Sequence, residues 1–212
     1  SSEDASLPGS SLPDISEEEG AAEFGVWLEE GACSDGVWLA GAWLFGVLFM
    51  RLYGRSLLDS DMASEMVLAD LLNREGGVLS QNWYYSTELR VFCEQLLFKL
   101  GLAVFPQDWH AARTLAQGLL SALVAVSALY FAYGARLRKS APWIAGALLC
   151  PFGFWQLFHG VFGGFYYVHM VFVMLSMGLV LRLAGRKASV RRTVLRAAVL
   201  AALAFAAGLN GV

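Results

Sequence analysis

Charged residues are scarce in this chain. Only 16% of its 212 residues are Asp, Glu, Lys or Arg, whereas an ordinary soluble domain carries about 25%. No acidic residue follows Asp108, and residues 1–35, which hold ten of the eighteen acids, contain no Lys or Arg. Because no basic stripe is present, a nucleic-acid-binding surface is not expected.

Cysteine is also rare, with three residues in the whole chain. Cys33, Cys93 and Cys150 are odd in number and lie far apart, and two of them have apolar neighbours. This pattern indicates neither a disulfide framework nor a cysteine metal cluster, so we expect small buried hydrophobic residues. His159 and His169 have no third ligand, so a histidine metal site is not expected either.

Long apolar runs, in contrast, are abundant. Hydrophobic residues make up 57% of the chain, and the mean hydropathy is +0.54. A membrane-spanning helix needs about 20 mostly apolar residues. The sequence therefore predicts an all-α fold, a polytopic transmembrane helix bundle of about five spans. The predicted spans are 37–53, 114–133, two helices within 141–181, and the run from 194 onward.

The longest uncharged run requires two helices. Residues 141–181 contain no Asp, Glu, Lys or Arg, and 41 residues are too many for one membrane crossing. The glycines of "HGVFGG", His159–Gly164, permit a chain reversal, so we place the turn between the third and fourth spans there.

Residues 1–36 differ from the rest of the chain. They are rich in Ser, Gly, Pro and acids and contain too little apolar surface to offset the entropy of ordering the chain. We predict a disordered acidic tail, because a secretory signal would begin with a basic region. Residues 37–212 then form the transmembrane domain. The chain starts at Ser1 and ends at Val212 without a charged stop, so we expect a fragment of a longer protein.

Basic residues predict the orientation of the bundle. The loop after the second predicted span and the loop before the fifth are both basic, and Lys and Arg are enriched in cytoplasmic loops. The N-terminus is then cytoplasmic and the loop 54–113 lies outside the cell membrane. Arg51 and Arg55, at the outer end of the first span, oppose this orientation but are outnumbered. The basic residues of the two loops are Arg136, Arg138, Lys139, Arg182, Arg186, Lys187, Arg191 and Arg192.

The outer loop 54–113 should carry structure of its own, because loops longer than about 15 residues usually do. Asp61–Arg74 has helix-forming residues and ends at Gly76 and Gly77, as a helix often does. Thr87–Leu100 is amphipathic, and a helix of this kind can lie flat at the membrane surface. Its polar side includes Glu94 and Gln95. Its predicted apolar face consists of Leu89, Phe92, Cys93, Leu96 and Leu100.

Acidic residues at the start of this loop are the candidate catalytic residues. Asp59 and Asp61 follow the first span in "RSLLDSDMASE", and Glu65 lies one helical turn beyond Asp61. Crowded carboxylates tend to have raised pKa values, which suits a general base. Asp59 and Asp61 would also suit a divalent cation, Mg²⁺ or Mn²⁺, as a cofactor. Alternatively, Asp61 or Ser60 simply caps the helix.

Aromatic and basic residues of the loop are candidate substrate-binding residues. Trp83, Tyr84 and Tyr85 are three consecutive aromatics that could stack on a sugar, although Trp and Tyr also form the ordinary belt at membrane interfaces. His110 and Arg113 fall at the expected level of the lipid headgroups. There they would hold a lipid phosphate or merely anchor the second span.

The loop also carries the most specific feature of the chain. The stretch "DSDMASEMVLADLLNREGGVLSQNWYYSTELRVFCEQLLFKL", Asp59–Leu100, is followed by "DWHAART". It resembles the first external loop of bacterial polytopic membrane glycosyltransferases of the GT-C type. The resemblance covers roughly residues 37–212 and is strongest across the loop.

This resemblance implies a membrane glycosyltransferase whose sugar donor is a polyprenyl phosphate or diphosphate and whose acceptor is unknown. It also implies a catalytic acid just after the first helix, which is Asp59 or Asp61. Asp61 is preferred because it begins the predicted helix. No motif assigns roles to Glu88 and Arg90, which we add to the candidate substrate-binding residues by position alone.

Two other functions remain open from the residues. A transporter or flippase of a lipid-linked molecule would place ionisable residues deep within its spans, and Arg51, near a span end, is almost the only one. A non-catalytic membrane assembly protein, whose outer loop binds a partner, is the second alternative.

Overall fold

The computed structural model describes residues 32–85, 91–184 and 189–210. The chain divides into two compact units, residues 1–37 and residues 38–212. All regular structure in the described residues is helical, which confirms the predicted all-α class. Most of the predicted acidic tail, residues 1–31, lies outside the described residues.

Seven α-helices, a 3₁₀ turn and a π-helical segment make up the described part of the chain. The first helix begins before the predicted start at residue 37. The elements are α2 (Ala32–Tyr53), α3 (Ser60–Glu75), α4 (Glu94–Val104), α5 (Trp109–Gly134), η1 (Arg138–Ser140), α6 (Ala141–Leu149), η2 (Gln156–Phe162), α7 (Tyr167–Ala184) and α8 (Val190–Gly208).

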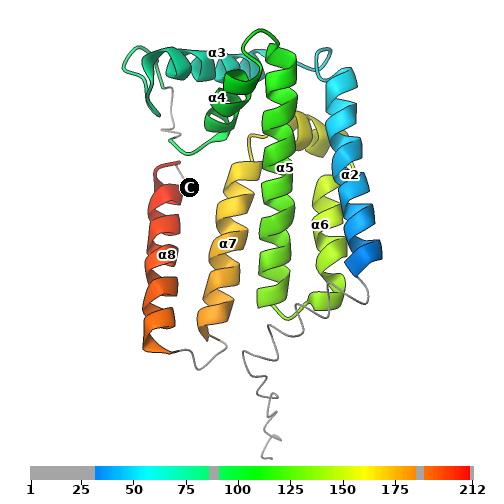
Figure 1. Cartoon of the computed structure of the whole chain (residues 1–212), viewed down its shortest axis with the longest axis vertical. Coiled ribbons are helices and arrows are strands. Elements are labelled where there is room, and N and C mark those ends of the chain that lie inside the picture. Colours follow the sequence, from blue (N-terminus) through cyan, green and yellow to red (C-terminus); the bar gives the residue numbers. More distant parts are fainter. Residues whose placement is uncertain (1–31, 86–90, 185–188, 211–212) are drawn as a thin grey trace, which may run out of the picture. The chain divides into compact units, whose positions relative to one another are not determined.

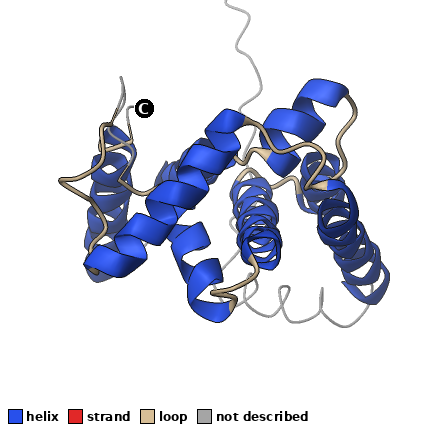
Figure 2. Cartoon of the chain, turned by 90° about the horizontal axis from the view of Figure 1, so that it is seen from above, coloured by secondary structure: helices blue, strands red, loops and turns tan. Residues whose placement is uncertain are grey.

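Five helices of the second unit stand side by side, and two lie across one end of them (Figures 1 and 2). The standing helices are α2, α5, α6, α7 and α8, whereas α3 and α4 cover the upper end in Figure 1. We call this end the α3–α4 end. The connection from α5 to α6, which carries Arg136, Arg138 and Lys139, lies at the opposite end. The predicted outer loop and this predicted basic loop are therefore at opposite ends of the unit, whereas residues 185–188 of the second predicted basic loop lie outside the described residues.

The prediction of five membrane spans is wrong. Three described helices are long and apolar enough to cross a membrane, over Asp35–Tyr53, Trp109–Gly134 and Tyr167–Ala184, which makes the chain a candidate multi-pass membrane protein. The predicted third span fails because α6 has only nine residues, which rise about 14 Å against the roughly 30 Å of a bilayer core. The predicted fifth span, from residue 194 onward, fails because α8 ends at Gly208 and reaches spanning length only by including Arg191 and Arg192 beside Arg196.

The turn predicted at His159–Gly164 lies partly inside a helix. His159 belongs to the π-helical segment η2, and the chain reverses just after it, before α7 begins at Tyr167. Gly164 has a φ of 75°, a left-handed conformation that glycine adopts without strain. A glycine therefore permits the reversal, as predicted, and that glycine is Gly164, the last residue of the motif.

The first helix of the outer loop matches its prediction and the second does not. α3 ends at Gly76, whose φ of 79° is the left-handed cap expected from the glycine pair. α4 begins only at Glu94, and Glu94 and Gln95, assigned to the polar side, are buried. Leu100, assigned to the apolar face, is half exposed. The predicted face is wrong because α4 packs against α3 and α5.

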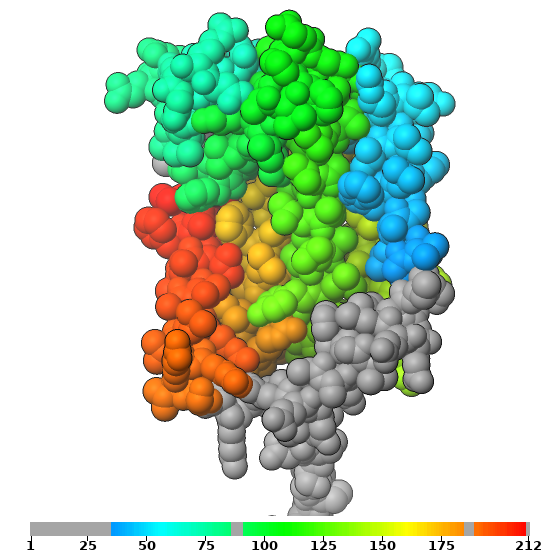
Figure 3. All heavy atoms as spheres, in the orientation of Figure 1, coloured from blue at the N-terminus to red at the C-terminus, as the bar shows by residue number. Residues whose placement is uncertain are grey.

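Two apolar clusters hold the second unit together. The first joins α2, α3, α5, η2 and α7, and the second fastens α3 and α4 onto the first half of α5. In the space-filling view the atoms of α3 and α4 lie beside the upper part of α5 (Figure 3). The second cluster consists of Met66, Ala69, Phe98, Leu102, Ala112 and Ala116.

The end of α8 is tied to the segment that precedes α4. The Asn210 side chain is buried, accepts a hydrogen bond from the Phe92 backbone N–H at 2.8 Å and donates one to the Phe92 carbonyl at 2.7 Å. Next to it, Cys93 is buried as predicted. Cys150, in contrast, is exposed, so the prediction of burial is wrong for that residue.

Candidate functional site

A pocket of about 430 Å³ opens beside the α3–α4 end, where the α2–α3 connection, α3 and the start of α5 meet. A second hollow, between α2 and α5, has a volume of about 10 Å³, which is room for roughly one water molecule. Only the first is large enough for part of a ligand. Its apolar wall is formed by Leu58, Ala63, Met66, Val67 and Trp109.

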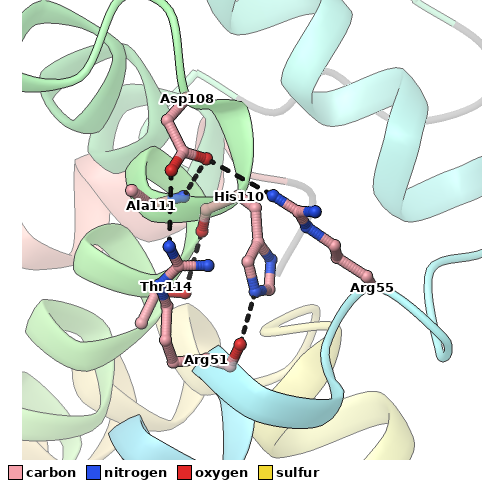
Figure 4. Close-up of polar contacts among 6 residues, drawn as sticks. All are labelled: Arg51, Arg55, Asp108, His110, Ala111 and Thr114. Atoms are coloured by element: carbon pink, nitrogen blue, oxygen red, sulfur yellow. Dashed lines mark hydrogen bonds and ion pairs between the residues drawn. The ribbon is translucent and has the colours of Figure 1, made fainter.

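The polar side of this pocket centres on Asp108, which precedes α5 (Figure 4). Asp108 caps the helix, because its Oδ1 accepts the Ala111 backbone N–H at 2.9 Å. Its other oxygen lies 3.4 Å from the Arg51 guanidinium, and Arg55 approaches within 4.0 Å. The Ala111 bond, followed by the charges of Arg51 and Arg55, holds the pKa of Asp108 below its usual range. The carboxylate therefore stays ionised at neutral pH.

Two predicted binding residues, His110 and Arg113, follow on the first turns of α5 and line the same pocket. The His110 Nε2 lies 2.7 Å from the Arg51 carbonyl oxygen (Figure 4), so the ring bridges α5 to the end of α2. Thr114 Oγ1 donates a hydrogen bond to the His110 carbonyl at 2.8 Å. The ring of His110 is thus held at the pocket wall.

Arg113 is a buried cation at the base of the pocket. Its guanidinium donates hydrogen bonds to the carbonyls of Met62, at 3.2 Å, and of Phe162, and it lies over the Phe98 ring at 5.1 Å. These contacts join α5 to α3, η2 and α4. Buried charges need such partners, since desolvating an unpaired charge costs several kcal/mol.

The three predicted catalytic acids occupy different environments. Asp59 is the N-cap of α3 and accepts the Met62 backbone N–H at 2.8 Å, so the capping role predicted for Asp61 or Ser60 belongs to Asp59. Asp61 is exposed in the first turn, and Glu65 is half buried. The electrostatic neighbours of Arg113 are Glu94, Asp59 and Glu65, in decreasing order of effect. Asp59 and Glu65, rather than Asp61, therefore lie close enough to Arg113 for their charges to act on it.

Helical geometry separates Asp61 from the pocket. Ala63, Met66 and Val67 line the pocket from one face of α3, at the spacing of three and four residues that marks a single face. At about 100° per residue, Asp61 and Glu65 each lie roughly 200° from Ala63, so both are on the side of the helix opposite to the pocket. Asp59, in contrast, directly follows the pocket residue Leu58.

The predicted divalent cation has few protein ligands. No group of three or more His, Cys, Asp or Glu residues that could hold a metal ion occurs among the described residues. Asp59 Oδ1 is also engaged by the helix cap. A cation at Asp59 and Asp61 would need ligands from a substrate or solvent, so this site stays a prediction, and we assign no chemical step to it.

The predicted aromatic segment lies apart from the pocket, none of whose lining residues it supplies. Tyr84 is 89% exposed, whereas the Tyr85 hydroxyl accepts the Ser80 backbone N–H at 3.0 Å and so closes a turn. Trp83 is half buried. The other two candidates of this segment, Glu88 and Arg90, lie outside the described residues.

The sequence did not indicate a buried acid beside Arg113. Glu94 is completely buried, and its Oε2 accepts a hydrogen bond from the Cys93 thiol at 2.8 Å. Burial, together with the negative charge of Glu94, raises the pKa of the Cys93 thiol, which therefore stays protonated and unreactive at neutral pH. The only available signal was that Glu94 directly follows Cys93 at a helix start, which by itself predicts no burial.

Comparisons of the chain with protein-family models, with curated proteins and with solved structures found no match.

Proposed function

We propose that this protein is a membrane glycosyltransferase that takes its sugar from a polyprenyl-phosphate donor bound in the pocket at the α3–α4 end. The observation that carries the proposal is the composition of that pocket. One wall is apolar and suits a lipid chain, while Arg55, His110 and Arg113 line the other side. Cations beside an apolar wall at the end of membrane spans suit the phosphate of a lipid.

The proposed reaction assigns a step to each charged group. Asp59 takes the proton from an acceptor hydroxyl, whose oxygen then forms a bond to the anomeric carbon of the sugar. The bond between that carbon and the phosphate oxygen breaks, and polyprenyl phosphate leaves with its electron pair. Arg55 and Arg113 stabilise the negative charge of the leaving phosphate. The acceptor is not specified by this chemistry.

The location of the charges supports this proposal over a transporter. In the three candidate spans, the charged residues are Asp35, Arg51, Arg113 and Arg182, and each lies within about two turns of a helix end. A transporter of a charged headgroup is expected to carry ionisable residues near the middle of its spans. A non-catalytic assembly protein remains the alternative if no transfer is detected.

Binding of polyprenyl phosphate tests the donor pocket. We expect Arg55→Gln to weaken binding on the order of tenfold, since one charge-assisted contact to phosphate is lost. Asp108→Asn should strengthen binding several-fold, because Asn keeps the helix cap but removes the negative charge that competes for Arg51 and Arg55. Native mass spectrometry of the protein in detergent, with polyprenyl phosphate and with uncharged polyprenol, measures both.

Matched controls make this test specific. Arg74→Gln removes an equally exposed arginine that pairs with Asp70 and does not line the pocket, so it should leave binding unchanged. Polyprenol should bind all variants equally. Equal affinity of the Arg55 and Arg74 variants for polyprenyl phosphate would place the donor phosphate elsewhere.

We further propose that the α3–α4 end faces the outside of the cell and the N-terminus faces the cytoplasm. The support is that the basic α5–α6 connection lies at the opposite end (Figure 1), and basic loops are usually cytoplasmic. In a variant whose native cysteines are replaced by alanine, Gln81→Cys should react with an impermeant thiol reagent in intact cells. Ser140→Cys should react only after permeabilisation. Both positions are exposed, and the reverse pattern would invert the orientation.

A further inference from the structure

The connection between α6 and α7 is irregular although it carries no charge. α6 ends at Leu149, the π-helical segment η2 covers Gln156–Phe162, and α7 begins at Tyr167. Residues 141–181 contain no Asp, Glu, Lys or Arg. A connection such as residues 150–166, which is irregular and uncharged, is unusual for a loop in water, where polar residues dominate.

The direction of the neighbouring helices shows where this connection runs. α5 and α7 are parallel (Figure 1), because Gln117 near the start of α5 bonds Gly163, while Tyr130 near its end bonds Arg182 near the end of α7. Both are candidate membrane spans. The chain between α5 and α7 must therefore cross the thickness of the membrane in the opposite direction, and α6 and η2 together make that crossing.

The polar backbone groups at the break have side-chain partners. In a bilayer, irregular backbone is tolerated only where such groups are satisfied within the protein. Four carbonyls are satisfied in this way. Tyr167 donates to Leu148 at 3.0 Å, Gln156 to Ala147 at 3.4 Å, Gln117 to Gly163 at 3.2 Å, and Arg113 to Phe162.

Aromatic side chains cover the outside of this connection. Phe152, Phe154, Trp155 and Tyr166 are 81%, 61%, 70% and 64% exposed, and we call them the aromatic surface. Trp155 stacks on His159 with ring centroids 5.0 Å apart, and Phe154 stacks on Phe158 at 5.6 Å. A cluster of large exposed apolar side chains marks an interaction surface rather than an ordinary water-exposed one.

We propose that the aromatic surface contacts the lipid bilayer at its interface on the side of the α3–α4 end. Three observations select lipid as the occupant. The surface carries no charge. The segment η2, on which Phe154 and Trp155 stack, contacts Phe49 of the candidate span α2 through the buried Phe162. In addition, η2 is bonded to Arg113 one turn below the start of α5. Trp and Tyr favour that depth of a bilayer because their rings are apolar and their N–H and O–H groups are polar.

Fluorescence quenching by brominated lipids tests this placement in the full chain reconstituted into vesicles. The emission of Trp155 is obtained by subtracting the fluorescence of the Trp155→Phe variant from that of the unaltered protein. We expect lipids brominated close to the headgroup to remove most of this emission, and lipids brominated near the chain end to remove less. Adding Tyr166→Trp to the Trp155→Phe variant should restore a signal that is quenched in the same way.

Two results would overturn the proposal. Loss of the emission mainly with bromine near the chain end would place the surface in the bilayer centre. No quenching with either lipid would mean that water, a second copy or another protein covers it. Circular dichroism of each variant verifies that the helices are intact, and Tyr166→Trp supplies an independent reading if Trp155→Phe misfolds.

Discussion

Asp59→Asn is expected to lower sugar transfer by about 100-fold to 10,000-fold, the usual contribution of a general base. Asn has nearly the size of Asp and can accept the Met62 backbone N–H that Asp59 accepts at 2.8 Å, so the helix cap is kept. Only the ability to take up the acceptor proton is lost. The measurement is release of polyprenyl phosphate from polyprenyl-phosphate hexoses in membranes that contain the protein, normalised to folded protein.

Asp61→Asn is the matched control for this experiment. It changes the same functional group two residues away, on the side of α3 opposite to the pocket-lining Ala63. Transfer should stay near normal. If Asp61→Asn rather than Asp59→Asn abolishes transfer, the base is the residue that the sequence favoured, and the pocket is not the donor site. If neither change affects transfer, the carboxylates are structural. If both changes lower transfer and the loss depends on added cation, the two carboxylates hold a metal.

Gly101→Ala is expected to destabilise the protein by about 1–3 kcal/mol, the usual cost of forcing an extra methyl group into a packed core. A Cβ at Gly101 would overlap the Ala112 carbonyl oxygen and would lie 2.9 Å from the Ala112 carbonyl carbon and 3.2 Å from its Cα. These are backbone atoms of α5, which cannot rotate away as a side chain could. α4 would have to move off α5 and disturb the wall of α3 that lines the pocket.

Thermal unfolding in detergent, followed by circular dichroism, measures this effect. The control is Gly46→Ala in α2, where nothing lies within 4 Å of the added Cβ. There Ala should be neutral or should stabilise by up to about 1 kcal/mol, because it favours helix more than Gly does. Both variants replace a helical glycine by alanine. Opposite signs of their changes in stability would therefore isolate the effect of the close contact between α4 and α5. Equal midpoints for the two variants would show that α4 does not pack this closely on α5.

Local structure was predictable where local residues decide it. The end of α3 follows from Gly76, which adopts the left-handed conformation that terminates a helix. The start of α5 at Trp109, which Asp108 caps, lies before the predicted start at residue 114. The spans α2, α5 and α7 follow from uninterrupted apolar runs, which need no knowledge of neighbours. The error in span number also has a local origin. Apolar composition alone does not distinguish a straight helix from the broken return made by α6 and η2.

The candidate site depended on contacts between distant parts of the chain. The sequence by itself determined an all-α, membrane-like chain with acids after the first span and with His110 and Arg113 at the start of another. Only the tertiary structure decided that Asp59 rather than Asp61 lies toward Arg113, and that Glu94 is buried beside them. The physical reason is that α3 and α4 are fixed by packing on α5. The face that a short helix buries is chosen by its partners, and the burial of Glu94 and Gln95 shows that these partners can override its own hydrophobic pattern.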